Sequence, residues 1–371
     1  MSMKINRAFK YRIYPNREQL SLINKTFGCN RYVFNHFLNQ RIRLYNNEKK
    51  STSYVNQAKE LTILKKELPW LKEVDSVSLQ STLRNLDSAF KNFFAKRSRF
   101  PRFKSKKNNI KSYTSKNTNN SIRIENNKLR LPKLGLVKIK LHRQIPTNYK
   151  ILSATVRLEP TGKYFVSILT EFEKEIIKVP SNGNIIGLDF SMNELFVSSE
   201  NQRADYPRFF RQLESKLAKE QRSLSRKIKF SNNWYKQKTK VAKIHNKIKN
   251  SRLDFLHKLS TELVDKYNAI AIEDLNMKAM SQALNFGKSV SDNGWGIFTS
   301  LLKYKAEGEG KQLVKIDKFF PSSKTCSFCG SIKSNLKLSD RMYICDCGIS
   351  IDRDLNAAIN IKNAGAKLLA Y

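Results

Sequence analysis

The sequence predicts an α+β protein of several domains, in which a β-sheet region carries a helical insertion and an α/β region follows it. Three observations support this prediction. The hydrophobic residues change from alternating to helical spacing and back along the 371 residues. Carboxylates end two short apolar β-like runs in the second half of the chain. Four of the five cysteines lie within residues 326–347, close enough in sequence to share one metal ion.

Composition narrows the class of protein. Hydrophobic residues make up 40% of the chain, which is enough to build real cores and excludes wholesale disorder. The sequence has no uninterrupted apolar run of the roughly 18 residues that a membrane helix needs, so we exclude an integral membrane protein. The first residues contain no apolar signal core, and the cysteines do not resemble a disulfide framework. We therefore expect a cytoplasmic protein.

The charge of the chain points to a polyanionic partner. Lysine and arginine number 70 against 31 aspartates and glutamates, which gives a formal net charge of +39. Such an excess repels itself in a compact fold unless a polyanion neutralises it, so nucleic acid is the natural partner. An acidic membrane surface is the alternative. The basic residues run through most of the chain and form no amphipathic anchor, so we expect no membrane partner. Charge alone does not specify the chemistry, since a ribosomal protein would be as basic.

The first half of the chain alternates between β-like and helical patterns. Residues 3–14 are β-rich and end at a Pro-Asn pair, which predicts a strand followed by a turn. Residues 18–94 carry apolar side chains three and four positions apart, which predicts three or four helices. Residues 91–150 contain eighteen lysines and arginines and one acid, and within them residues 104–121 are expected to form an exposed basic loop. Short β runs then predict a small barrel or curled sheet that the first strand joins; they are residues 121–124, 128–131, 137–141, 153–158 and 164–169.

The second half begins after a linker signal at residues 180–183. Residues 185–190, a turn and residues 195–197 predict a buried hairpin with an acid in its first strand. Residues 207–263 have helical spacing and a strong basic excess. A solvated helical hairpin would look the same, but the net charge of the chain favours a role in following phosphates. The remaining predicted elements are strands at residues 269–272 and 313–316 and a short helix at residues 355–364.

Three carboxylates stand where predicted elements end. Asp189 and Glu273 lie in apolar β runs, where a buried carboxylate needs a cation, a hydrogen-bond network or a raised pKa. Adjacent strand residues point to opposite faces, so Asp274 cannot share a site with Glu273 on a regular strand. Asp354 begins the last helix. Each acid alone could be a strand end, a lysine partner or a helix cap. Together, in so basic a protein, they suggest a Mg²⁺ site that could hydrolyse a phosphodiester.

The cysteines form two pairs, C-x2-C and C-x-C, separated by fifteen residues. Four thiolates suit tetrahedral Zn²⁺ in a closed structural site. The second pair has one intervening residue in place of the usual two, which tightens that knuckle. Cys29 stands alone on a predicted helix and is expected to be a core residue. The predicted ligands of one structural Zn²⁺ are Cys326, Cys329, Cys345 and Cys347.

These features resemble one family, the TnpB proteins encoded by bacterial insertion sequences, which are relatives of type V CRISPR effectors. The resemblance covers nearly the whole chain. It depends most on the order of an aspartate in G-L-D, a glutamate in I-E-D-L-N, the cysteine cluster and an aspartate in D-R-D-L-N-A-A-I-N-I. One departure is Ser191, where the family often has glycine, and we expect little effect from it. The matching segments are residues 27–35, 79–86, 100–104, 187–189, 272–276, 326–330 and 352–361.

The resemblance implies a fold, an activity and a set of partners. The fold would combine a wedge-like β-barrel domain, an inserted helical recognition region and a RuvC-like nuclease domain of the RNase H fold with an inserted zinc ribbon. Asp189, Glu273 and Asp354 would be the catalytic acids and would hold two Mg²⁺ ions. A guide RNA from the transposon end would direct cleavage of both strands of a DNA target beside a short motif. The implied domains are residues 1–15 with 105–180 for the wedge, 16–104 for the recognition region, 181–320 with 350–371 for the nuclease and 321–349 for the ribbon.

Three functions remain to be separated. An RNA-guided DNA endonuclease is the leading hypothesis. A nuclease-inactive, RNA-guided repressor would bind DNA without cutting it, and a guide-independent RNase H-fold transposase would act on element ends without RNA. Gln80 and Arg84 share one predicted helix, in the region that the resemblance places near the motif duplex. They are candidate nucleic-acid contacts, although ordinary exposed helix residues would look the same. The sequence does not fix the oligomeric state, and a monomer is the simplest expectation.

Overall fold

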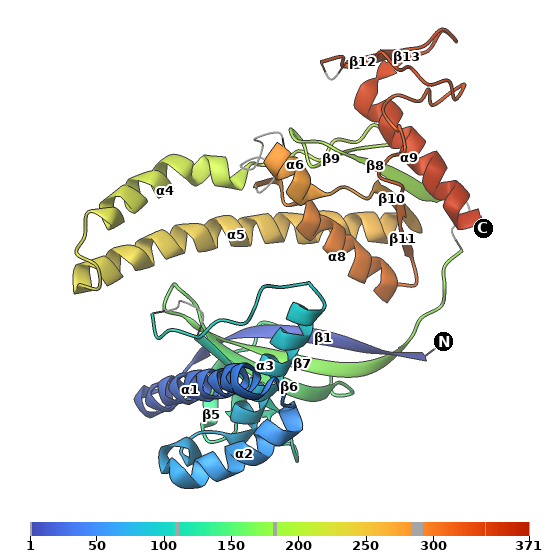
Figure 1. Ribbon diagram of the computed structural model, residues 1–371. Helices are drawn as coiled ribbons and strands as arrows, with labels where there is room; N and C mark the ends of the chain where they lie inside the picture. The colour runs from blue at the N-terminus through green and yellow to red at the C-terminus, as the bar shows by residue number, and fades with distance from the viewer. Residues whose placement is uncertain (1, 108–110, 181–183, 284–291, 338, 371) are drawn as a thin grey trace. The chain divides into compact units, whose positions relative to one another are not determined.

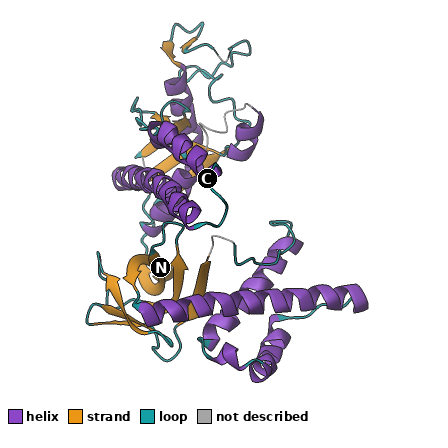
Figure 2. Ribbon diagram, turned by 90° about the vertical axis from the view of Figure 1, so that its left-hand side faces the viewer, coloured by secondary structure: helices purple, strands orange, loops and turns teal. Residues whose placement is uncertain are grey.

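The structure is a computed structural model, and its chain forms two compact units. One unit comprises Lys4–Lys174, and the other comprises Met1–Met3 with Glu175–Tyr371. Each unit contains a sheet packed against helices, as the colours of Figure 2 show. Among the described residues no helix is long and apolar enough to cross a membrane. Most of the linker expected at residues 180–183 lies outside the described residues, which are 2–107, 111–180, 184–283, 292–337 and 339–370.

The unit Lys4–Lys174 contains a seven-stranded sheet (Figure 1). Its strands are β1 (Ser2–Tyr14), β2 (Lys111–Lys116), β3 (Arg123–Glu125), β4 (Lys128–Leu131), β5 (Gly135–Lys140), β6 (Lys150–Leu158) and β7 (Tyr164–Glu175). Their order is β2-β6-β7-β1-β5-β4-β3, so the first strand joins the sheet, as predicted. Alternate side chains of β1, namely Phe9, Tyr11 and Ile13, are buried in the core of this sheet. In this order β2 and β3 are the edges, and the described pairings do not close the sheet into a barrel.

Helices are inserted between β1 and β2. They are α1 (Arg17–Glu48), α2 (Tyr54–Glu67), the 3-10 helix η1 (Pro69–Lys72) and α3 (Ser76–Phe94). A capping box starts α1: the Asn16 side chain accepts a hydrogen bond from the Gln19 N–H at 2.8 Å, and the Gln19 side chain accepts one from the Asn16 N–H at 3.1 Å. The apolar side chains that recur at helical spacing, such as Phe37 and Leu83, form a core of their own. Cys29 belongs to that core, as predicted.

The prediction of an exposed loop over residues 104–121 is wrong in part, because strand β2 lies within it. The strand pairs with β6, and Tyr113 lies opposite Val156. Tyr113 and Ser115 face the interior and are buried, whereas Ser112, the residue before Tyr113, is exposed. The strand has only one apolar residue at its inward positions, so hydrophobic alternation could not reveal it.

The second unit is built on a four-stranded sheet. Its strands are β8 (Ile185–Phe190), β9 (Phe196–Ser198), β10 (Ala269–Glu273) and β11 (Gln312–Ile316). The order is β11-β10-β8-β9, in which β10 runs parallel to both β8 and β11, and β9 runs antiparallel to β8. Its described helices are α4 (Phe209–Ser225), α5 (Asn232–Lys266), α6 (Met277–Ala283), α8 (Trp295–Gly308) and α9 (Arg353–Ala370).

Helices cover both faces of this sheet. On one face Leu188, Ile270 and Ile272 pack in a core with residues of α5 and α8. On the other face Ala271 and Ile361 share a small core, so α9 lies there. The basic run over residues 207–263 is the helical hairpin α4–α5, as predicted. The last helix is longer than predicted and follows directly on the two-stranded sheet of β12 (Met342–Ile344) and β13 (Ser350–Asp352).

Candidate metal centres

Asp189 and Glu273 lie at the same level near the carboxyl ends of two neighbouring parallel strands. The register pairs Ile272 of β10 with Leu188 of β8, so the next residue of each strand is one of the two acids. Paired residues on adjacent strands project to the same face of a sheet. Both carboxylates therefore lie on one face, at the carboxyl ends of β8 and β10, where ligands of parallel sheets are commonly bound.

A glycine shows which helix covers that face at Asp189. Gly187 lies two residues before Asp189 and so faces the same side. A Cβ atom added at Gly187 would stand 2.1 Å from the carbonyl oxygen of Ala358 in α9. The G-L-D motif therefore needs glycine because the backbones of β8 and α9 approach too closely for any side chain.

A second glycine gives the same result at Glu273. A Cβ atom added at Gly365 of α9 would stand 2.5 Å from the Cβ of Ala271, which lies two residues before Glu273 on β10. Helix α9 therefore packs on the face to which both acids point. Asp354 lies in the first turn of that helix. Its negative charge is among the causes that raise the pKa of Asp189.

The electrostatics of the three acids are unfavourable without a cation. Burial raises the pKa of Asp189 well above its usual value, and the charges of Glu273 and Asp354 raise it further, although Arg353 lowers it. Burial also raises the pKa of Glu273 and of Asp354, and Asp352 adds to the rise at Asp354. Clustered carboxylates with raised pKa values suit a hard divalent cation, which stabilises their ionised forms. The donor set therefore fits Mg²⁺.

Glu273 and Asp274 are adjacent in the sequence but lie in different surroundings, as strand geometry predicts. The hydroxyl of Ser322 donates a hydrogen bond to Oε1 of Glu273, which lowers the pKa of Glu273 against the effect of burial. Asp274 is exposed and pairs with Lys315 at 2.6 Å. Only Glu273 joins the cluster, and Ser322 is a supporting residue that no sequence pattern indicated.

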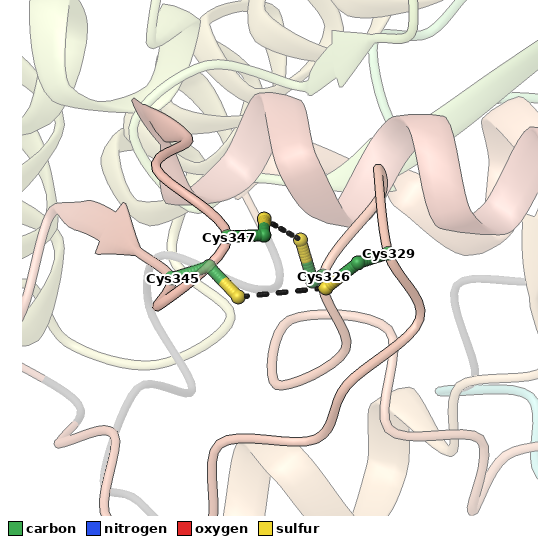
Figure 3. Close-up of side chains that lie close together, drawn as sticks. All are labelled: Cys326, Cys329, Cys345 and Cys347. Carbon is green, nitrogen blue, oxygen red and sulfur yellow. Dashed lines mark hydrogen bonds between the residues drawn. The ribbon is translucent and has the colours of Figure 1, made fainter.

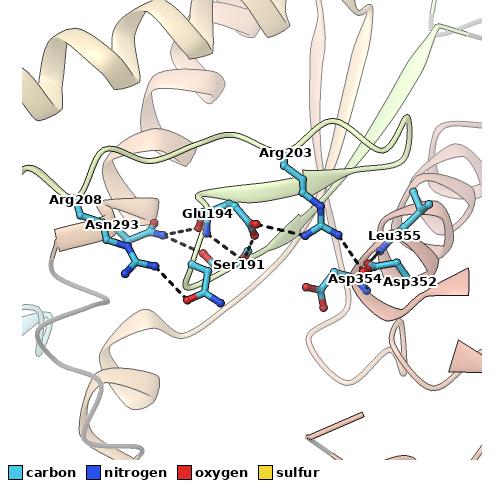
Figure 4. Close-up of polar contacts among 9 residues, drawn as sticks. Ser191, Glu194, Arg203, Arg208, Asn293, Asp352, Asp354 and Leu355 are labelled. Carbon is cyan, nitrogen blue, oxygen red and sulfur yellow. Dashed lines mark hydrogen bonds and ion pairs between the residues drawn. The ribbon is translucent and has the colours of Figure 1, made fainter. Parts of the chain in front are cut away.

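The turn after β8 is braced by side chains (Figure 4). The Ser191 hydroxyl donates to Oε2 of Glu194 at 2.8 Å and accepts from the Glu194 N–H at 3.3 Å. The amide of Asn293 donates to the carbonyl oxygens of Ser191 and Glu194 at 3.0 and 3.1 Å. The hydroxyl of Ser191 therefore helps to order this turn.

Arg203 connects this turn to the start of α9. Its guanidinium donates to Asp352 at 2.9 Å and to Glu194 at 3.4 Å (Figure 4). Oδ1 of Asp352 accepts hydrogen bonds from the N–H groups of Asp354 and Leu355, each at 3.0 Å, and so caps the helix. Sequence reasoning singled out neither Arg203 nor Asp352, because arginine is common throughout this basic chain.

The four cysteines form the second candidate centre. Their sulfur atoms all lie within 4.8 Å of one another. The side chains of the C-x2-C and C-x-C pairs point toward one another in Figure 3, with Cys326 3.7 Å from Cys347 and Cys329 3.6 Å from Cys345. One tetrahedral Zn²⁺ fits four sulfur ligands in this arrangement. The short C-x-C pair thus brings Cys347 into the group with the other three.

The pKa values of the Cys329 and Cys347 thiols are shifted in opposite directions. Hydrogen bonds from Ser331 lower the pKa of Cys329 to about 6. The pKa of Cys347 is raised to about 12: the Ile349 N–H lowers it, but burial and hydrogen bonds with the other three cysteines outweigh that effect. Four thiolates cannot coexist at neutral pH without a cation, so binding of zinc must displace protons from this cluster.

Two asparagines tie the cysteine segment to α9. The Asn356 side chain accepts from the Ser327 N–H at 2.9 Å and donates to the Thr325 carbonyl oxygen at 2.7 Å. Asn360, one turn later, donates to the carbonyl oxygens of Ser322 and Thr325 at 2.8 and 2.6 Å. Both side chains are buried. Asparagines four residues apart on an otherwise apolar helix face were the signal in the sequence that could have revealed this contact.

The candidate nucleic-acid residues lie on α3, and both are exposed. Gln80 and Arg84 are one helical turn apart and so share one face of that helix. The Arg84 guanidinium lies 4.4 Å from the centre of the Tyr54 ring at the start of α2. That cation–π contact orients Arg84 and leaves its hydrogen-bond donors available.

Comparison with known proteins gives the family. A relative from Streptomyces pristinaespiralis, named as an RNA-guided DNA endonuclease, is 40% identical over 368 residues, covering 98% of this chain and 90% of the relative. This chain belongs to the TnpB family. InsQ of Escherichia coli K12, which is also named as an RNA-guided DNA endonuclease, is 33% identical over 386 residues, or 99% of this chain and 94% of InsQ.

Three family models match parts of the chain. The OrfB_IS605 model, described as a probable transposase, matches residues 167–284, and the Cas12f1-like TNB domain model matches residues 295–361. A helix-turn-helix model matches residues 1–50, but the described part of that segment contains one strand and one continuous helix. The structural matches include a Cas12f1–sgRNA–target DNA complex at 15% identity and a TM-score of 0.38, which covers 97% of this chain and 99% of that one.

Proposed function

We propose that this protein is the RNA-guided DNA endonuclease of a transposable element. Two relatives that span nearly the whole chain are named as RNA-guided DNA endonucleases, and the family models match most of the second half of the chain. The proposal is supported by the placement of Asp189 and Glu273 side by side on the α9 face of the sheet and by the charge of Asp354, which raises the pKa of Asp189. A repressor that only bound DNA would have no need of three mutually repelling carboxylates.

In this proposal the three acids hold two Mg²⁺ ions. Mg²⁺ bound there would supply an activated water and would stabilise the leaving oxygen of a phosphodiester. Asp189 and Glu273 approach from rigid strand ends and Asp354 from a capped helix, so their oxygens are positioned before substrate arrives. Ser322 holds one oxygen of Glu273, which leaves the other free for a metal ion.

The domain assignment follows the same proposal. We assign residues 181–320 with 350–371 to a RuvC-like nuclease domain and residues 321–349 to a zinc ribbon held by the four cysteines. The order of the parallel strands and the covering helix α9 support the first assignment, and the sulfur cluster supports the second. Residues 1–15 with 105–180 would form the wedge-like β domain, and residues 16–104 the recognition region.

The proposed partners are a guide RNA from the transposon end and a double-stranded DNA target beside a short motif. The net charge of +39 supports both, since each is a polyanion. Gln80 and Arg84 are proposed to face the motif duplex, because an exposed glutamine and an oriented guanidinium can both read base edges.

One experiment separates this proposal from its rivals. The gene would be expressed with its native downstream DNA, the protein purified in moderately high salt, and the bound RNA sequenced. A single protected RNA that ends beyond the element is expected, and plasmid DNA matching that end should be cut in Mg²⁺. A defined RNA without cutting would indicate a repressor. Only heterogeneous RNA that is lost as salt rises would contradict the guided function and favour a transposase.

A further inference from the structure

Arg203 stands in the same row of the sheet as Asp189. Asp189 pairs with Val197 of β9, and Val197 forms an antiparallel bridge with Arg203 on its other side. Directly paired residues across a sheet project to one face. The side chain of Arg203 therefore lies on the face that carries the Asp189 carboxylate, and neighbouring backbone hydrogen bonds of Ala204 hold this segment to the strand.

From that position the guanidinium joins the segments that carry the first and third acids. One nitrogen donates to Oδ2 of Asp352 at 2.9 Å, and the other donates to Oε1 of Glu194 at 3.4 Å. Asp352 caps the helix of Asp354, and Glu194 belongs to the braced turn that follows Asp189. A single side chain thus spans two elements that are about 150 residues apart in the sequence.

We propose that Arg203 is a positioning residue that sets the spacing between the carboxylates of Asp189 and Asp354, and through it the affinity of the site for divalent metal. The inference rests on the proposed function, in which these acids hold Mg²⁺. It requires no contact between Arg203 and the metal or the substrate.

The contact with Arg203 also determines what the carboxylate of Asp352 can bind. Asp352 lies two residues from Asp354 and carries the same kind of oxygen ligand. Arg203 engages Oδ2, and two backbone N–H groups engage Oδ1. Both oxygens are therefore occupied, so Asp352 acts as a cap and does not compete with Asp354 for a metal ion.

A merely structural ion pair would behave differently. The side chains of Arg203 and Asp352 are each 36% exposed, and ion pairs at that exposure contribute little to the free energy of unfolding. Loss of Arg203 should therefore leave the melting temperature nearly unchanged and weaken metal binding instead. Lysine could meet only one of the two carboxylates at a time, so it should restore part of the affinity.

The test measures metal binding directly. Mn²⁺ binding to the purified RNA-bound protein would be followed by electron paramagnetic resonance, and the signal that Asp189→Asn removes would be assigned to the acid site. Arg203→Met should raise the dissociation constant of that component about tenfold, and Arg203→Lys should raise it about threefold. Lys266→Met is the matched control, because it removes an exposed ion pair with Glu200 in the same unit. The control should stay within about twofold of the parent protein.

A double variant tests the route through Asp352. Asp352→Asn keeps a capping oxygen but loses the charged pair, so Arg203→Met should cost less metal affinity in that background than in the parent protein. An unchanged dissociation constant for Arg203→Met, or equal effects in both backgrounds, would overturn the positioning role. Absence of any Asp189-dependent Mn²⁺ signal in the parent protein would instead contradict the proposed metal site itself.

Discussion

Each of the two candidate metal centres consists of side chains that bind metal ions in their deprotonated form, but the chain assembles the two centres in opposite ways. The four cysteines lie within 22 residues, and local knuckles bring their sulfur atoms within 4.8 Å. The three carboxylates of the proposed acid centre span residues 189–354 and come from two parallel strands and from the helix that covers them. The first centre is thus encoded locally, whereas the second is a property of the whole fold. Substitutions in the two centres should therefore have different effects on the protein.

The largest expected effect is the loss of chemistry at the fold-assembled centre. Asp189→Ala should reduce guided DNA cleavage about a thousandfold, because metal-ion stabilisation supplies several kcal/mol of the barrier reduction. RNA and target binding should persist, since the change removes none of the positive charges that attract phosphates. Cleavage of a matched plasmid and gel-shift binding would be measured together. Cutting by the variant as fast as by the parent would show that the site is misassigned.

Disturbance of the locally encoded centre should act through structure. Cys326→Ser should remove the single zinc ion per chain and unfold residues 321–349 locally, because zinc binding is coupled to folding in such modules. Cleavage should fall as well, since Asn356 and Asn360 tie the cysteine segment to the helix of Asp354. Elemental analysis and hydrogen exchange would measure the two effects. Zinc content and exchange that match the parent would contradict this view.

The same centre should respond to pH with a defined sign. Zinc needs thiolates, and the pKa of Cys347 is raised to about 12, so binding must expel protons. Zinc affinity should therefore rise with pH and fall as pH drops toward about 5. Competition with a chromophoric chelator at several pH values would measure the slope, and a flat profile would count against four thiolate ligands.

The close packing of α9 gives a smaller effect on stability. Gly187→Ala places a methyl group against the Ala358 carbonyl oxygen and should destabilise the unit by roughly 1–3 kcal/mol. Gly296→Ala in α8 is the matched control, because no neighbouring atom lies within 4 Å of the position that its Cβ would take. That change should be neutral or should stabilise by about 0.5–1 kcal/mol. Urea unfolding of both variants would measure the difference, and equal stabilities would refute the close approach of β8 and α9.

The smallest effect comes from charge repulsion among the acids. The pKa of Asp189 is raised in the folded state, so ionisation of Asp189 destabilises the metal-free fold. The stability that Asp189 contributes is therefore present below its ordinary pKa and is lost as pH rises through the raised value. Asp189→Asn cannot ionise, so it should stabilise the metal-free protein at neutral pH by about 1–2 kcal/mol. Melting curves in chelator should show no such gain below about pH 4, and a loss of stability at neutral pH would contradict the burial of this charge.

The comparison also explains how far the sequence could predict the molecule. Spacing alone indicated the cysteine cluster, because its ligands are close in sequence, and apolar periodicity indicated most helices and strands. The three acids could be named from their positions at strand and helix ends, but the placement of Asp189 and Glu273 under α9 depends on the strand register and on Gly187 and Gly365. Strand β2 was missed because its inward positions hold one tyrosine and a serine. No sequence pattern indicated Arg203, because its contacts with Glu194 and Asp352 form only in the folded protein.

A crystal of the RNA-bound protein soaked in Mn²⁺ would test the three-acid centre most directly. Anomalous diffraction at the manganese edge should place density among Asp189, Glu273 and Asp354, and data at the zinc edge should place one ion among the four cysteines. Manganese density at Glu194 and Asp352 instead, with none among the three acids, would contradict the proposed site. That result would mean that the face beneath α9 is not where this protein binds its catalytic metal.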